Sequence, residues 1–422
     1  MNMANSFLGG AQDRLLPASI PFRFFLAAAL FHVLAWAILF VGAEEVASFR
    51  GGPGKTLAAI HLVTLGVLTM AAMGASYQLL PVVTRRPLAR DGPARLSFWL
   101  MVPGIVILTL GMGLATPSTM LVGAALVCGG LLLFLVLTAD NLRRASSLPV
   151  VSTHGWLALV SLVILATLGI LLIVDFESGF LDSHSDLALI HMIIGSFGFM
   201  GFLVLGLSLV LVPMFALSQS PSRTPGWLQA ALTSLMLACI SGAIFFEILS
   251  LFWISATLAI IAACCYLWLM RSALASRMRK RLGLSFVLIR ASWAMMVLAL
   301  ALGVAWLADA PLPNAPTLTG FVILVGWLLT FLFGILQRIM PFLASMHAAD
   351  KSGRPQLLSE LTPENPLKVH LICHFTAILM CVTGIVINES LVLQGGAVFG
   401  LIGAVAFLTF ATRVTLKLRH GK

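Results

Sequence analysis

The chain has 422 residues, of which 60% are hydrophobic and only 9% are charged. Soluble domains carry roughly 25% charged residues, so this composition excludes a soluble protein and predicts an all-α polytopic membrane protein. The formal net charge of +10 does not indicate a nucleic-acid partner, because the basic residues gather in the connections between apolar segments.

Twelve apolar segments of membrane-spanning length follow one another along the chain. About 20 helical residues cross the hydrocarbon layer of a bilayer. The predicted spans are 20–43, 57–81, 96–116, 118–138, 155–176, 187–214, 227–247, 249–270, 288–308, 317–342, 368–388 and 394–414. The sequence therefore predicts twelve transmembrane helices, four in each third of the chain, with the lipid bilayer as their partner.

Three of these segments share a pattern in which a glycine stands seven residues before a proline. The pairs are Gly74–Pro81, Gly206–Pro213 and Gly334–Pro341. Proline has no N–H group and should end or kink each helix, while the glycine should let a neighbouring helix approach closely. Because the pairs recur at nearly equal intervals, we expect one membrane domain built from the pseudo-repeats 1-150, 151-285 and 286-422.

The placement of Lys and Arg predicts the orientation of the chain in the membrane. The connections after the even-numbered segments are basic, whereas the opposite connections hold only Arg50 and Lys55. Basic connections stay in the cytoplasm, so both termini should be cytoplasmic, in a bacterial inner (plasma) membrane. The outer face is acidic, which indicates either ordinary solvated loops or a landing surface for a cationic redox partner or respiratory subunit.

Two histidines occupy equivalent positions in the repeat. His61 and His191 each open a repeated segment near the outer face, and His32 lies near the middle of the first segment. Ionisable residues inside membrane spans are candidates for function, and a neutral imidazole is a common ligand of haem iron and copper. We therefore predict that His61 and His191 bind a cofactor, with His32 as a possible third member. Taken alone, a buried histidine of this kind is more often a satisfied polar residue than a ligand.

Other side chains suggest further sites near both faces. His370 and His374 are four residues apart and share a helix face, and His347 lies toward the same inner side. Together with His191 and His184 near the outer face, they are the candidate metal ligands. Glu247 and Glu389 each end a segment five residues after a glycine, so they are candidates for proton handling or for contact with water at the interface.

This constellation resembles subunit I of the haem–copper oxidase superfamily, including the nitric-oxide reductases and the NnrS-like membrane haem proteins. Helices in groups of four, cytoplasmic termini, and His61 and His191 on helices two and six carry the resemblance. It implies that His61 is a low-spin haem ligand and His191 a copper ligand. The family's histidines on helices seven and ten are missing here, as is its tyrosine one turn after His191, which implies a divergent relative without the full oxygen-reducing ligand set.

The resemblance implies a membrane protein that binds haem, or copper or iron, in respiratory electron transfer or in nitric-oxide or nitrogen-oxide metabolism or response. Such a protein could be a divergent oxidoreductase. Two other functions fit the sequence: a transporter of a small solute or metal ion, and an assembly partner of an oxidase. Internal repeats also occur in transporters, although repeats with an even number of helices keep one orientation and so lack the inverted-repeat signature.

Overall fold

The computed structural model describes residues 16–420, except 89, 146–147 and 348–356. Twelve of its helices are long and apolar enough to cross a membrane, as the sequence predicted. Nine of these spans are single α-helices: α2 (Ser19–Val41), α6 (Gly92–Gly113), α7 (Pro117–Arg143), α8 (Pro149–Ser178), α11 (Arg223–Phe246), α12 (Leu249–Ala275), α13 (Leu284–Leu307), α17 (Glu364–Ile387) and α18 (Ser390–His420). The short helices α3 (Ala43–Val46) and α16 (Leu358–Leu361) lie between spans.

The other three spans each contain a stretch of π-helix. They are α4–η2–α5 (Lys55–His61, Leu62–Thr69, Met70–Thr84), α9–η3–α10 (His184–Ile193, Ile194–Met200, Gly201–Ala216) and α14–η4–α15 (Ala315–Phe321, Val322–Leu329, Thr330–His347). π-Helix is rare and frequently marks functional sites. Thr69 and Thr330 each donate a side-chain hydrogen bond to the carbonyl five residues earlier, at 2.8 and 2.9 Å, which supports the ends of two of these stretches.

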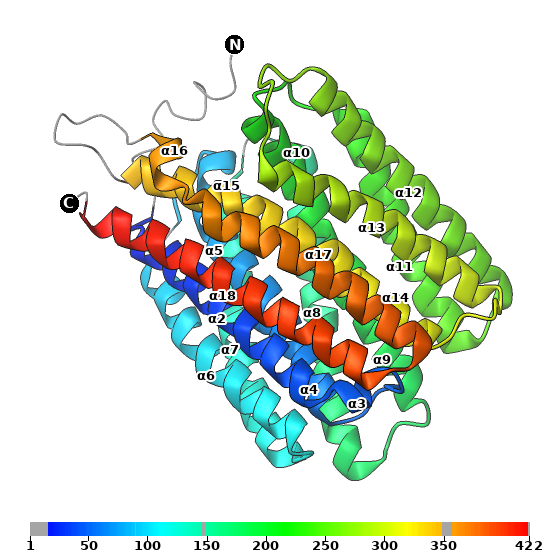
Figure 1. Ribbon diagram of the computed structural model, residues 1–422. Helices are drawn as coiled ribbons and strands as arrows, with labels where there is room; N and C mark the ends of the chain where they lie inside the picture. Colours follow the sequence, from blue (N-terminus) through cyan, green and yellow to red (C-terminus); the bar gives the residue numbers. More distant parts are fainter. Residues whose placement is uncertain (1–15, 89, 146–147, 348–356, 421–422) are drawn as a thin grey trace.

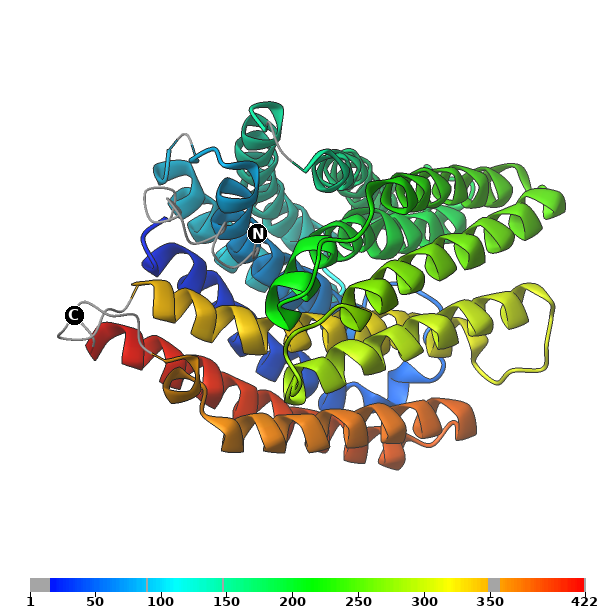
Figure 2. The ribbon, with the colours of Figure 1, turned by 90° about the horizontal axis from the view of Figure 1, so that it is seen from above.

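These three π-containing spans form the centre of the bundle. In their most apolar windows 61%, 83% and 83% of the residues are buried, against 17–44% in the other nine spans. η4 packs against both η2 and η3. Around them, α7 packs on α8, α12 on α13, and α18 on α2. Figures 1 and 2 show the outer helices from two sides.

The helices lie roughly along one direction, and α2 begins at the same end of the bundle as α18 ends (Figure 1). We call the opposite end the acidic end; it is formed by the connections that follow α2, α6, α8, α11, α13 and α17. The pairs α6–α7, α11–α12 and α17–α18 are tight hairpins that turn at this end.

The glycines of the repeated pattern lie where two helices come closest. A Cβ atom added at Gly74 would lie 2.7 Å from Phe24 Cβ on α2, one at Gly206 would lie 2.5 Å from His154 Cβ on α8, and one at Gly334 would lie 2.7 Å from Ile289 Cγ1 on α13. Each central span is thus packed against the span directly before it. The predicted role of these glycines in close helix approach is confirmed.

A second glycine, which the sequence analysis missed, precedes each of them by eight residues. Gly66, Gly198 and Gly326 lie within the π-helical stretches and face the same helices, α2, α8 and α13, at 2.8, 2.8 and 3.3 Å from an added Cβ to its nearest neighbour. The signal was present in the sequence as a glycine at the same offset in all three copies.

The prolines do not end the central spans. Pro81, Pro213 and Pro341 lie inside helices that continue to Thr84, Ala216 and His347, so of the two predicted effects, ending or kinking the helix, the first is excluded. A proline removes one backbone hydrogen bond, but its carbonyl still accepts. The amides of Arg86 and Ser218 bond to the carbonyls of Pro81 and Pro213 at 3.1 and 3.0 Å and complete the last turn.

The close approach at Gly334 predicts the effect of a single methyl group. In Gly334→Ala the new Cβ would also lie 2.9 Å from the carbonyl oxygen of Ser285, and because backbone cannot move aside easily we expect a loss of about 1–3 kcal/mol of stability. Gly303→Ala on α13 is the matched control: nothing lies within 4 Å of its Cβ, so it should be neutral or stabilising by up to ~1 kcal/mol. Unfolding of the purified protein in detergent measures both, and equal stability of the two variants would contradict the packing described.

Candidate functional site

The fold brings His61 and His191 together, as the sequence predicted for the repeat. His61 is the last residue of α4, directly before η2, and His191 lies in the last turn of α9, before η3. Their ring centroids are 6.4 Å apart and the ring planes are inclined by only 26°. Two central spans therefore present one imidazole each at a common level near the acidic end.

Backbone carbonyls fix both imidazoles in the same chemical form. Nδ1 of His61 lies 3.0 Å from the carbonyl oxygen of Leu57, and Nδ1 of His191 lies 3.1 Å from that of Leu165 on α8. A carbonyl can only accept, so each Nδ1 carries the hydrogen and each neutral ring keeps a lone pair on Nε2. Metal-binding histidines are oriented in this way, with the second nitrogen donating to a carbonyl or carboxylate.

Gly169 makes room for the His191 ring. A Cβ added at Gly169 would lie 3.2 Å from Cε1 of His191, so the imidazole rests against bare backbone of α8. Both histidines are only partly buried, and neither Nε2 has a hydrogen-bond partner among residues that the structure describes. The two lone pairs are free to bind a ligand.

The spacing of the pair fits one metal centre between the two rings. The 6.4 Å between the ring centroids is compatible with one metal ion held by both rings through metal–nitrogen bonds of about 2 Å. Within the described part of the chain, no group of three His, Cys, Asp or Glu side chains could hold a metal ion. A protein site for zinc or a similar ion needs three or four such ligands, whereas haem brings four of its own and needs at most two. The donor set therefore fits haem best.

His32 does not join this pair. It is buried beside Phe333, with ring centroids 4.5 Å apart, and beside His370, at 6.3 Å. His61 and His191 precede the π-helical stretches η2 and η3 in their spans, whereas Phe333 follows η4. Because His32 packs on Phe333, it lies on the other side of the π-helical stretches from His61 and His191. The prediction of His32 as a third member of the His61–His191 site is wrong, because its helix, α2, presents it toward α15 and α17.

The predicted inner metal site does not form as expected. His370 and His374 do lie together, with ring centroids 5.4 Å apart and planes within 15°. His347 lies elsewhere: its two nitrogens face the carbonyl oxygens of Leu343 and Leu16 at 2.8 and 3.0 Å. It is therefore not available as a metal ligand beside them.

His184 is also engaged in the structure of a turn. Its Nδ1 lies 2.6 Å from Oδ2 of Asp175, and the other carboxylate oxygen accepts the amide hydrogen of Leu181 at 2.7 Å. Through these two hydrogen bonds, Asp175 stabilises the connection between α8 and α9. The prediction that His184 is a metal ligand has no support, because no group of three His, Cys, Asp or Glu side chains that could hold a metal ion forms among the described residues.

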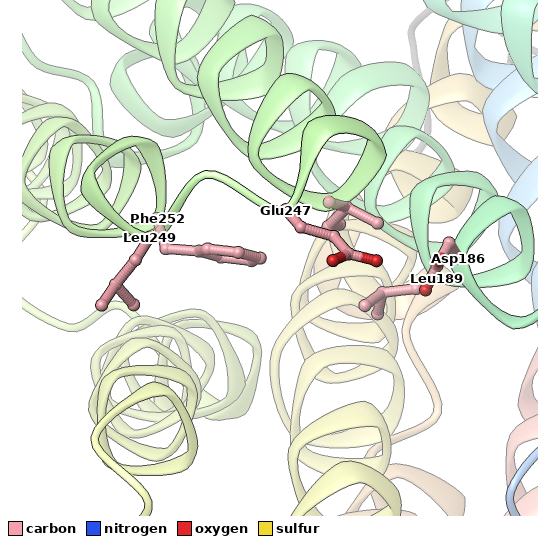
Figure 3. A pocket seen from close by; sticks show the side chains of 6 residues that line it. Asp186, Leu189, Glu247, Leu249 and Phe252 are labelled. Carbon is pink, nitrogen blue, oxygen red and sulfur yellow. The ribbon is translucent and has the colours of Figure 1, made fainter. Parts of the chain in front are cut away.

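The two glutamates of the repeated pattern are exposed at the acidic end. Glu247 caps α11 with a positive φ of 54°, and Glu389 stands between α17 and α18. Glu247 and Asp186 point toward one another across a cavity of about 270 Å³ (Figure 3), which is lined by Asp186, Leu189, Ile244, Glu247, Leu249 and Phe252. Both glutamates are exposed at helix ends, which favours the interfacial role over proton handling inside the bundle.

The two hydrogen bonds of Asp175 predict how fast the backbone amides of this turn exchange with solvent. Asp175→Ala removes the acceptor of the Leu181 amide and of His184. Because hydrogen bonds to charged groups contribute about 1.5–3 kcal/mol, hydrogen–deuterium exchange at residues 179–184 should become about tenfold faster or more. Asp182→Ala, an exposed acid in the same turn, is the control. If exchange in Asp175→Ala is no faster than in this control, Asp175 does not stabilise the turn.

No protein-family model matches the chain, and no curated protein matches it either. What the site does has to follow from its own residues and their geometry.

Proposed function

We propose that this protein is an integral membrane haem protein in which His61 and His191 would together hold one haem. The observation that carries the proposal is the pair itself: two nearly parallel imidazoles, 6.4 Å apart between centroids, each with Nδ1 committed to a carbonyl. When bound, haem supplies one-electron redox chemistry. The chain's part is to fix both ring orientations through Leu57 and Leu165.

The arrangement of helices supports a second part of the proposal, that the chain is built from the three pseudo-repeats 1-150, 151-285 and 286-422. In each, the second span contains the π-helical stretch and packs its two glycines against the first span. We infer an architecture like subunit I of the haem–copper oxidases. The chain would be a divergent member, because the described residues hold no third ligand that could build a copper centre at His191.

A single haem near the acidic end suits electron transfer with a partner outside the membrane. We place this end outside the cytoplasm, in a bacterial inner membrane, because the opposite connections carry Lys and Arg. The acidic surface would then receive a cationic redox partner or a respiratory subunit. The reaction would belong to respiratory electron transfer or to nitrogen-oxide metabolism, with nitric oxide as one candidate reactant.

The optical spectrum tests this proposal directly. Protein expressed with haem supplied should bind one haem per chain and show the Soret band of a six-coordinate iron. His61→Ala and His191→Ala each remove one axial ligand, so the band should shift to that of a five-coordinate iron or haem should be lost. His184→Ala is the matched control, because His184 is engaged by Asp175, and its spectrum should not change.

Three results would contradict the proposal. These are protein without a Soret band, a haem spectrum that survives both single substitutions, and an equal effect of His184→Ala. Metal analysis distinguishes the related case of a copper or iron ion held without porphyrin.

A further inference from the structure

We propose that His32 and His370, which form one buried cluster with His374, hold a buried water molecule that joins His32 to His370 in a hydrogen-bonded chain inside the membrane. The cluster lies on the other side of the π-helical stretches from His61 and His191 and shares no residue with that pair, so the inference stands independently of the haem. It rests on the hydrogen-bonding balance of three buried rings.

The three histidines are sealed between helices. Their exposed fractions are 1% for His32, 0% for His370 and 2% for His374. His32 comes from α2 and the other two from α17, and Phe333 of α15 packs against His32 and His370, at 4.5 and 4.8 Å between ring centroids. Leaving a polar group unpaired in such surroundings costs about 1–3 kcal/mol.

Trp36 fixes the form of the His32 ring. Its indole Nε1 lies 2.8 Å from Nε2 of His32. An indole N–H can only donate, so Nε2 of His32 is the acceptor and its Nδ1 carries the hydrogen. This Nδ1–H is buried and has no partner among the described residues. Since Nδ1 is protonated, His32 is not free to ligate a metal.

Thr330 fixes the His374 ring in the opposite form. The Thr330 hydroxyl donates to the carbonyl oxygen of Val325 at 2.9 Å, and the same oxygen lies 2.7 Å from Nε2 of His374. The single hydroxyl hydrogen is used by the carbonyl, so His374 must donate from Nε2. This leaves the lone pair of His374 on Nδ1.

His370 lies between these two rings with neither nitrogen satisfied. Its ring centroid is 6.3 Å from that of His32 and 5.4 Å from that of His374. Both its nitrogens are buried without a partner in the described part of the chain. A neutral imidazole offers one donor and one acceptor, so a ligand between Nδ1–H of His32 and the unprotonated nitrogen of His370 has to accept from the first ring and donate to the second.

Water meets these requirements better than a metal ion does. One water can accept from Nδ1 of His32 and donate to the unprotonated nitrogen of His370, and the separation of 6.3 Å between ring centroids is compatible with one bridging atom at hydrogen bonds of about 2.8 Å. Buried waters occupy such sites, between otherwise unsatisfied polar groups. A metal would have only His370 and His374 as ligands.

The resulting chain runs from Trp36 through His32 and the water to His370. The water therefore joins α2 and α17 by hydrogen bonds, which separate apolar-packed rings would not provide.

Solid-state NMR of the full-length protein in nanodiscs, with ¹⁵N-labelled histidine, tests this inference. We expect the Nδ1–H form for His32 and the Nε2–H form for His374, and magnetisation transfer from water to the nitrogens of His32 and His370. His154 is the internal control. It is equally buried, at 1% exposure, but its two nitrogens are bonded to Val150 and Gln229 at 2.8 and 2.7 Å, so it should receive no transfer.

A second arm uses His370→Leu, which removes one side of the bridge. The water signal at His32 should fall to the level of His154, while the resonances of His154 itself stay in place and show that the fold is intact. The inference is overturned if wild-type His32 and His370 show no more water transfer than His154. It is also overturned if the ¹⁵N shifts and metal analysis show a stoichiometric metal on His370.

Discussion

The close contact between each central span and the span before it is the constraint on which the rest of this structure depends. In lipid, helices gain little from hydrophobic burial against each other, so association relies on packing and on small residues at the contact. The glycines at Gly66, Gly74 and their counterparts let the central spans approach α2, α8 and α13 until a single added methyl group would clash. This packing places the three π-helical stretches side by side at the centre of the bundle.

The π-helical stretches in turn separate two histidine clusters. His61 and His191 stand directly before η2 and η3, near the acidic end, whereas Thr330 begins the helix after η4 and bonds to His374. The first cluster has free lone pairs and a spacing suited to an iron atom. The second has unpaired donors and acceptors and one ring, His32, that is held in a form unable to ligate a metal. The same residue type thus serves two different chemistries because of its hydrogen-bond partners.

Much of the fold was predictable from the sequence, because membrane spans depend on length and composition alone. All twelve segments are helical, and the glycine pattern marked real contacts. The effect of the prolines was not predictable in the same way, because the local rule does not say whether the turn after Pro81 is completed by other bonds. The meeting of His61 and His191 followed from their equivalent positions. The separation of His32 from them, and the engagement of His184 by Asp175, depended on side-chain direction and on the turn between α8 and α9, which spacing in the chain does not encode.

The most direct test of the central claim is electron paramagnetic resonance of the oxidised, haem-loaded protein, with detection of the nitrogens coupled to the iron. If one haem lies between His61 and His191, the iron should be low-spin and coupled to two histidine nitrogens as well as to those of the porphyrin. A high-spin iron, or coupling to only one histidine nitrogen, would show that the pair does not hold the haem between its two rings.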